Sequence, residues 1–208
     1  MKRCVESVPR LFGVLPIVLQ KCYTIGVTHY QRIEQEAIGS NGVFTYRTAK
    51  DIGIRSVELL RWIKAGKVIK AGHGVYRLAA YPVEGELMDR ALLLAEVGDG
   101  SCLWGETALG FLGLCPTRSY VAYVGTPRRI RRHLSSGVFI RKLPVGYKPF
   151  YPKGVACQKV EDAIRVAAET IEGDRLCEAI DAAIEGGYLM GSEGEALKRE
   201  ICDGQAAT

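Results

Sequence analysis

Hydrophobic positions between residues 42 and 78 follow a helical spacing at first and a strand-like spacing afterwards. The spacing predicts a short helix that begins after Thr45, whose hydroxyl is a good N-cap, and that turns Ala49 and Ile52 inward. Gly53 then allows the tight turn that a following helix requires. The apolar residues expected on the buried face of that second helix are Leu59, Leu60 and Ile63.

The second helix is expected to start at Ser56 and to end at Gly66, because glycine commonly terminates helices. Beyond it, the β-forming residues 67–70 and 75–78 flank a tip that contains two glycines. Two helices joined by a turn and followed by a hairpin constitute a winged helix-turn-helix, with the hairpin as the wing. The pattern predicts a module that binds double-stranded DNA; the alternative is a protein-docking module of the same fold.

Segments on both sides extend this module. Residues 29–38 predict a helix with one apolar face, which completes a three-helix core. Helical spacing resumes over residues 83–96, after a Tyr-Pro pair that ends the wing. We therefore expect an extension over residues 1–28, a DNA-binding domain over residues 29–82 and a second domain over residues 83–208.

The second domain is expected to mix helices and strands. Residues 101–116 predict an apolar helix, residues 120–124 and 137–142 predict two strands, and residues 160–201 have helical spacing throughout. The fold class is therefore α+β: an N-terminal winged helix-turn-helix followed by a mixed α/β domain that ends in helices.

The extension at residues 1–28 stands outside this pattern. Its basic start and the apolar residues 11–19 imitate a signal peptide, but no small-residue cleavage site follows and the apolar run is too short to span a bilayer. Three interpretations remain open: a leader created by an upstream start codon, an extra packing element, or a weak export signal. We favour the first, because a DNA-binding module has no use outside the cell.

Composition places the chain among ordinary globular proteins. Of its 208 residues, 48% are hydrophobic and 25% are charged. Its seven cysteines form no CxxC pair, which argues against a zinc ribbon and against a secreted disulfide framework. We therefore expect a protein of the reducing cytoplasm that makes no contact with a membrane.

The polar residues of the predicted module lie where DNA would need them. Residues at the start of a recognition helix reach base edges, whereas the preceding helix and the wing reach phosphates. Between residues 29 and 80, nine Lys or Arg residues outnumber four Asp or Glu residues, a net charge of +5. An ordinary solvated helix face is the alternative. The candidates for DNA binding are Arg47, Thr48, Arg55, Ser56, Arg61, Lys64, Lys67, Lys70, His73 and Arg77.

Charge is segregated into two blocks in the C-terminal half. Residues 117–153 contain nine Lys or Arg residues and no acid, whereas residues 154–208 contain twelve acids and five bases. The basic block includes an arginine-rich turn that suits nucleic acid, an acidic protein surface or the acidic helices of the same chain. A solvated turn with internal ion pairs is the alternative. The candidates for binding a partner or nucleic acid in this domain are Arg128, Arg129, Arg131, Arg132 and Arg141.

No catalytic or metal-binding motif accompanies these residues. The sequence lacks a Walker loop, a GxSxG elbow and an HExxH motif, and its three histidines lie in separate segments. A nuclease core would need clustered acids with a Glu-x-Lys element, which the chain also lacks. We therefore expect no enzyme activity, no catalytic residues, no cofactor and no metal ion.

The order of these elements resembles that of the AbiEi-type antitoxins of type IV toxin–antitoxin systems, over residues 30–201. The resemblance is most specific in the winged helix, in the segments TAKDIG, LLRWIKAGKV and GVYRL. The segment ETALGFLGL at residues 106–114 resembles the helix that opens the family's second domain. The segments PRRIRRH and DRLCEAIDAAIEGGYL resemble its arginine-rich strand turn and its closing helices.

This resemblance implies two roles. The winged helix would repress the chain's own operon by binding the promoter, and the C-terminal domain would neutralise a partner toxin that resembles a nucleotidyltransferase. In type IV systems the antitoxin need not form a stable complex with its toxin, so the arginine-rich turn would act on the toxin's target or on DNA. The sequence leaves both options open.

A stand-alone winged-helix regulator, whose second domain senses a ligand or forms dimers, is the main alternative. The neighbouring gene separates the two hypotheses: a nucleotidyltransferase-like gene beside this one favours the antitoxin, and an isolated gene favours the plain regulator. An enzyme is a further alternative, because nucleic-acid modules are often joined to catalytic ones.

Overall fold

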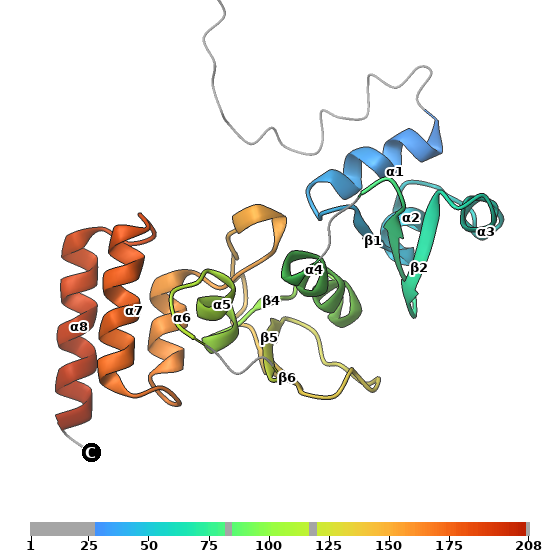
Figure 1. Ribbon diagram of the computed structural model, residues 1–208. Helices are drawn as coiled ribbons and strands as arrows, with labels where there is room; N and C mark the ends of the chain where they lie inside the picture. Colours follow the sequence, from blue (N-terminus) through green and yellow to red (C-terminus); the bar gives the residue numbers. More distant parts are fainter. Residues whose placement is uncertain (1–27, 82–84, 117–119, 207–208) are drawn as a thin grey trace, which may run out of the picture.

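The computed structural model describes residues 28–81, 85–116 and 120–206 (Figure 1). These residues form two three-stranded sheets with helices packed around them. The apolar residues 11–19 and the expected boundary at residue 82 lie outside the described residues. The division of the chain into two domains therefore stays a prediction.

The N-terminal module is a winged helix-turn-helix, as the sequence predicts. Its three helices pack on a sheet of strand order β1-β3-β2, in which both pairs are antiparallel. One hydrophobic cluster, which includes Ile33, Leu59 and Leu78, joins the helices to the sheet. Its elements are α1 (His29–Ile38), β1 (Val43–Thr45), α2 (Tyr46–Asp51), α3 (Ser56–Lys64), β2 (Val68–Gly72) and β3 (Val75–Leu78).

The expected helix boundaries are confirmed. The hydroxyl of Thr45 accepts a hydrogen bond from the backbone N–H of Thr48 at 3.1 Å and so caps α2. Gly53 turns the chain between α2 and α3 with a φ of +92°, and Gly66 follows α3 with a φ of +69°. The sequence pattern does not reveal β1, because three residues are too few to show an alternation.

The expected burial of Leu60 is wrong. Leu59 is 3% exposed and lies in the core, whereas Leu60 is 56% exposed. The inward-facing stripe of α3 consists instead of the buried Leu59 and the partly buried Trp62 and Ile63. The ring of Trp62 packs edge-on against that of Tyr30, with 5.3 Å between the ring centroids. Leu60 lies one residue past this stripe, which turns it about 100° away from the core.

The helix α4 (Glu86–Val97) covers the other face of the first sheet. Met88 and Ala91 of this helix pack against Val43 and Val75 of the sheet. The sheet therefore lies between the three-helix core and α4, which connects the winged helix to the rest of the chain (Figure 1).

The second sheet has the strand order β4-β5-β6. Strands β5 and β6 are parallel neighbours, so the chain must cross over between them, and residues 127–137 make this connection. Its strands are β4 (Cys102–Leu103), β5 (Ala122–Thr126) and β6 (Val138–Lys142). The remaining elements are α5 (Glu106–Phe111), the short 3-10 helix η2 (Pro152–Gly154), α6 (Val160–Ala167), α7 (Gly173–Glu185) and α8 (Gly191–Ala206).

Two expectations for this half need correction. The helix expected over residues 101–116 is confined to α5, because β4 pairs with β5 and Gly105, with a φ of +50°, starts the helix. The buried side chain of Gln158 accepts a hydrogen bond from the N–H of Gly105 at 2.7 Å and holds this helix start. The helical region 160–201 is divided into α6, α7 and α8 by turns. Across the described residues, we find no helix with the length and apolar character needed to cross a membrane.

Candidate nucleic-acid interface

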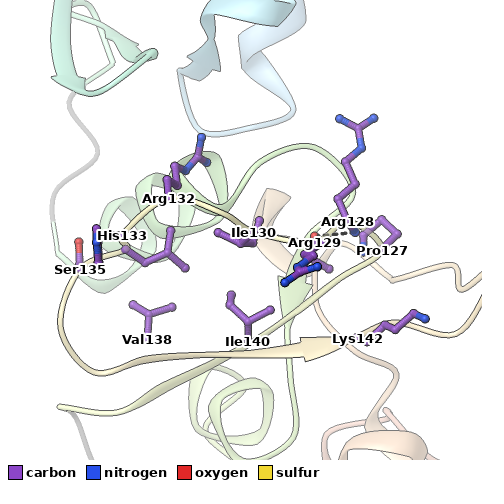
Figure 2. A pocket seen from close by; sticks show the side chains of 12 residues that line it. Pro127, Arg128, Arg129, Ile130, Arg132, His133, Ser135, Val138, Ile140 and Lys142 are labelled. Atoms are coloured by element: carbon purple, nitrogen blue, oxygen red, sulfur yellow. Dashed lines mark hydrogen bonds between the residues drawn. The ribbon is translucent and has the colours of Figure 1, made fainter.

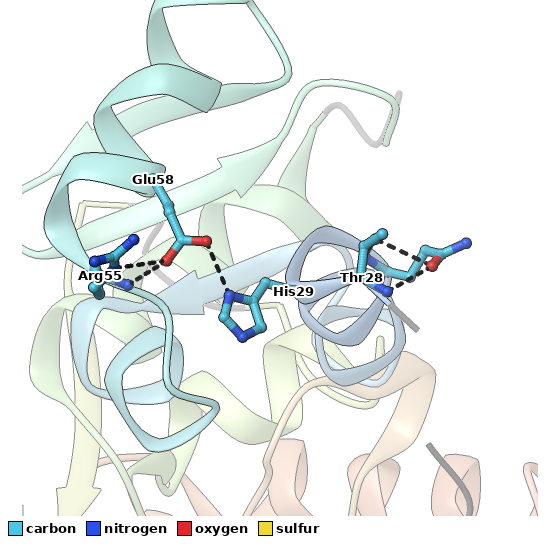
Figure 3. A network of polar contacts seen from close by, with 5 residues as sticks. Thr28, His29, Arg55 and Glu58 are labelled. Atoms are coloured by element: carbon cyan, nitrogen blue, oxygen red, sulfur yellow. Dashed lines mark hydrogen bonds and ion pairs between the residues drawn. The ribbon is translucent and has the colours of Figure 1, made fainter. Parts of the chain in front are cut away.

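The first turn of α3 is held by Glu58 rather than by a side-chain cap (Figure 3). One carboxylate oxygen of Glu58 accepts the backbone N–H of Arg55 at 3.0 Å, and the other lies 2.9 Å from Nδ1 of His29 on α1. These contacts turn Glu58 towards α1. The side chain of Arg55 remains 82% exposed in front of the helix, which suits a role in contacting DNA.

Glu58 makes this helix start sensitive to acid. The backbone N–H of Arg55, followed by the hydrogen bond with His29, lowers the pKa of Glu58 below its ordinary value of 4.5. A lowered pKa in the folded state contributes stability above 4.5, and this contribution is lost as the pH falls through the lowered pKa. Acidification from neutral pH to below 4.5 should therefore lower the free energy of unfolding more in the wild-type protein than in the Glu58→Gln variant. Urea titrations at a series of pH values measure this difference, and parallel curves for the two proteins would contradict it.

The predicted DNA-binding residues of α3 all lie on its exposed side. Ser56, Arg61 and Lys64 are exposed, and the hydroxyl of Ser56 is 2.9 Å from that of Tyr46 at the start of α2. The same side exposes Val57 and Leu60, which the sequence reasoning did not assign to binding. Their position opposite the buried stripe of α3 is the signal that identifies them.

The two candidates on α2 already have partners within the protein. The Thr48 hydroxyl lies 2.9 Å from the Thr45 hydroxyl, within the helix cap. Nε of Arg47 is 3.4 Å from Asp99, which follows α4, and 3.9 Å from Asp51. Both ion pairs are exposed and therefore weak, so a phosphate could displace them. The assignment of Arg47 and Thr48 to DNA binding stays a prediction.

The wing residues divide between two faces of the first sheet. Lys70 and His73 are exposed near the tip, and the ammonium group of Lys67 lies 5.1 Å from the ring centre of Tyr30. Arg77 is half-buried in the central strand, where the alternation of side chains places it on the same face as Val75, towards α4. Lys67, Lys70 and His73 are therefore better placed for DNA than Arg77.

The connection between β5 and β6, residues 127–137, is called the arginine turn below. Ile130 of this turn faces Val138 and Ile140 of β6 (Figure 2). The three side chains help to line a cavity of about 640 Å³ between the turn and β6. Arg128 and Arg132 point the other way, towards the winged helix. Glu96 of α4 accepts hydrogen bonds from the backbone N–H of Ser135 at 3.2 Å and from its hydroxyl at 2.9 Å, which fixes the turn to α4.

Among the residues that the structure describes, the arginines of this turn have no carboxylate partners. In the described part of the chain, none of the four lies within 4.0 Å of an Asp or Glu oxygen. The acidic C-terminal helices pair with their own bases instead, as Glu161 and Glu200 do with Arg165. The alternative of a turn neutralised by internal ion pairs is therefore wrong for the described residues, and the turn presents unneutralised positive charge.

A recess of about 540 Å³ joins the arginine turn to the winged helix. Tyr46 lines this recess. The hydroxyl of Tyr46 also forms a hydrogen bond with the hydroxyl of Ser56, at the start of α3. The start of α3, the tip of the wing and the arginine turn therefore form one continuous surface. We call it the cationic surface; its members are Arg47, Ser56, His73, Arg128, Arg129, Arg131 and Arg132.

Arg141 does not belong to this surface. Val138, Ile140 and Lys142 of β6 line the cavity under the arginine turn, whereas Arg141 lines a small cavity with Trp104 and Glu169. Because side chains of a strand alternate between faces, Arg141 lies on the opposite side of the second sheet. The sequence grouped it with the turn through proximity along the chain alone.

Nothing in the described residues forms a metal centre, since no group of three His, Cys, Asp or Glu side chains there could hold an ion. Burial raises the pKa of the Cys102 and Cys157 thiols to about 12, so both remain protonated at neutral pH and are poor nucleophiles. The cationic surface gathers Arg47 and the four arginines of the turn, and guanidinium groups bind anions.

Comparison with known families finds a match in the N-terminal module. Residues 31–79 match the family model described as transcriptional regulator, AbiEi antitoxin. Over these residues the winged helix is similar to that of AbiEi-type antitoxin regulators. No curated protein matches the chain. The matched residues run from α1 to the end of β3, so the match includes α3 and the wing, whereas the arginine turn lies beyond it.

Proposed function

We propose that this chain is an antitoxin of a type IV toxin–antitoxin operon that represses its own promoter and counteracts a nucleotidyltransferase-like toxin. The family match supports a transcriptional regulator of the antitoxin class. The continuity of the cationic surface, through Tyr46 from α3 to the arginine turn, carries the DNA-binding part of this proposal. The protein acts by binding in the cytoplasm, without catalysis and without a cofactor.

The geometry suggests how one duplex engages both parts. The start of α3 enters the major groove, where Arg55 and Ser56 face base edges. The arginine turn, held to α4 by Glu96, then lies beside the sugar–phosphate backbone of the same duplex. When guanidinium groups neutralise phosphates, cations condensed on the DNA are released, which adds affinity but no sequence information.

Binding to the promoter across a salt series tests this proposal. Wild-type protein is expected to prefer its own upstream DNA over a scrambled duplex of equal length. The Arg128→Ala/Arg132→Ala variant should reduce the slope of log K against log salt by about 0.9 for each phosphate that it no longer neutralises. The Lys148→Ala/Arg199→Ala variant removes the same charge from exposed positions elsewhere and should keep the wild-type slope more closely. Equal slopes for both variants would remove the arginine turn from the DNA interface.

Co-expression with the neighbouring gene tests the antitoxin role. If a nucleotidyltransferase-like gene accompanies this one and is expressed from an unrelated promoter, the full chain is expected to restore growth. The Arg55→Ala/Arg61→Ala variant should restore growth equally, because neutralisation of the toxin does not require promoter binding. Failure of the wild-type chain to restore growth would contradict the antitoxin role and leave the regulator.

The cavity under the arginine turn favours one second candidate, a regulator that senses a ligand. Its volume of about 640 Å³ suits a small molecule, and its lining combines Ile130, Val138 and Ile140 with Arg129 and Lys142. An anion with an apolar part fits this lining. A gene without a toxin neighbour, together with promoter release on addition of such a ligand, would favour this candidate over the antitoxin.

A further inference from the structure

The outward face of α3 carries an apolar pair beside two cations. Positions 57, 60, 61 and 64 are spaced i, i+3, i+4 and i+7, which places them on one side of a helix. Val57 is 57% exposed and Leu60 is 56% exposed, although the helix has a complete buried stripe on its other side. Arg61 and Lys64 are the exposed basic residues of the set.

This patch is not explained by the fold. Single exposed apolar residues are ordinary, but Val57 and Leu60 are neighbours on one face, and α3 uses neither to hold the module together. The acid of this helix, Glu58, is turned away towards His29 and Arg55. The patch therefore combines apolar side chains with positive charge and presents no carboxylate from α3.

We infer that Val57 and Leu60 bind the 5-methyl groups of two thymines on neighbouring base pairs of the operator. The inference rests on the proposed function, because it requires α3 to lie in the major groove. Thymine is the base that presents a methyl group there, and apolar side chains are its usual partners. Residues three apart on a helix rise roughly 4.5 Å, which is close to the step of about 3.4 Å between base pairs.

The charges beside the patch favour DNA over a second copy of the chain. Arg61 and Lys64 lie next to the apolar pair, where phosphates of both strands flank a major groove. In a two-fold interface the same patch faces itself, which would bring these cations of two copies together. DNA satisfies the apolar and the basic residues at once, whereas a second copy satisfies the apolar pair alone.

Replacing thymine by uracil tests the inference, because it removes the methyl group and keeps the base pairing. Two promoter duplexes are compared, one with thymidine and one with 2′-deoxyuridine at every thymine. Wild-type protein is expected to bind the uracil duplex on the order of tenfold more weakly than the thymine duplex. Each methyl group that a side chain no longer covers should weaken the affinity roughly fourfold.

The Val57→Ala/Leu60→Ala variant supplies the second arm. It should bind the thymine duplex on the order of tenfold more weakly than wild type and should lose most of the discrimination between thymine and uracil. Alanine keeps helix propensity, and both positions are exposed, so the melting temperature should stay near that of wild type. Ile38→Ala truncates an apolar side chain that is 60% exposed on α1 and should leave discrimination unchanged.

Each outcome decides the inference. Equal thymine-to-uracil ratios for wild type and the Val57→Ala/Leu60→Ala variant would overturn it, because the methyl effect would then act through DNA shape. A change of the variant from dimer to monomer in light scattering, with an unchanged ratio, would assign the patch to an interface between copies and also overturn it. If wild type prefers neither promoter duplex over a scrambled one, the proposed function itself fails. Specific promoter binding without methyl discrimination refutes this inference alone.

Discussion

The Arg55→Ala/Arg61→Ala variant is expected to lose specific binding to promoter DNA, at about 1–3 kcal/mol for each side chain. Arg55 stands in front of α3 with its side chain 82% exposed, and Arg61 lies on the face of the helix opposite the core. Neither is needed for packing, and the exposed pair between Arg55 and Glu58 contributes little to stability. The loss should therefore appear in binding and not in the melting temperature. Titration of a labelled promoter duplex measures it.

The Lys148→Ala/Arg199→Ala variant controls for net charge. It removes two exposed cations that lie outside the cationic surface, so it should weaken binding far less than the Arg55→Ala/Arg61→Ala variant. The single variants then separate two roles. A residue that contacts a base relaxes discrimination at one position, whereas a residue that contacts phosphate weakens all duplexes alike. Equal losses for the two double variants would mean that α3 makes no specific contact.

The Gly137→Ala variant is expected to lose about 2–4 kcal/mol of unfolding free energy. Gly137 closes the arginine turn with a φ of +83°, a conformation that disfavours any side chain. A Cβ atom at this position would also overlap the backbone carbonyl oxygen of Tyr120, which cannot rotate away as a side chain could. The start of β6 and its pairing with β5 must shift to relieve this overlap.

The matched control is Gly146→Ala. Gly146 has nearly the same φ, +78°, but no atom lies within 4 Å of the position its Cβ would take. It should therefore lose only the conformational part, about 1 kcal/mol. Urea unfolding of both variants isolates the effect of the overlap. Similar losses would show that the backbone at Gly137 relaxes at little cost.

The α+β class and the winged helix follow from the sequence because they depend on local signals. The hydroxyl of Thr45, the positive φ of Gly53 and the apolar spacing of α1 each act within a few residues. Strand β1 and the start of α5 depend instead on partners far away in the chain. Val43 pairs with Arg77, and Gln158 holds Gly105 at the start of α5. Local spacing contains no information about such partners.

The candidate site divides in the same way. Ser56, Arg61 and Lys64 of α3 and Arg55 just before it are exposed, as the sequence predicts, because helical periodicity separates two faces. The assignment of Leu60 to the core failed because α3 has more apolar residues than its buried stripe needs. The roles of these residues in DNA binding remain predictions that the variants above test.

Short segments of the sequence were sufficient to predict a winged helix with a basic surface that resembles the AbiEi type, since caps, glycine turns and apolar periodicity act over a few residues. Only the tertiary structure shows which charged side chains lie on one surface. The contact of Glu96 with Ser135 holds the arginine turn beside the wing, and the alternation of β6 sends Arg141 to the other face of its sheet. The physical reason is that long-range packing, and not distance along the chain, sets the positions of side chains relative to one another.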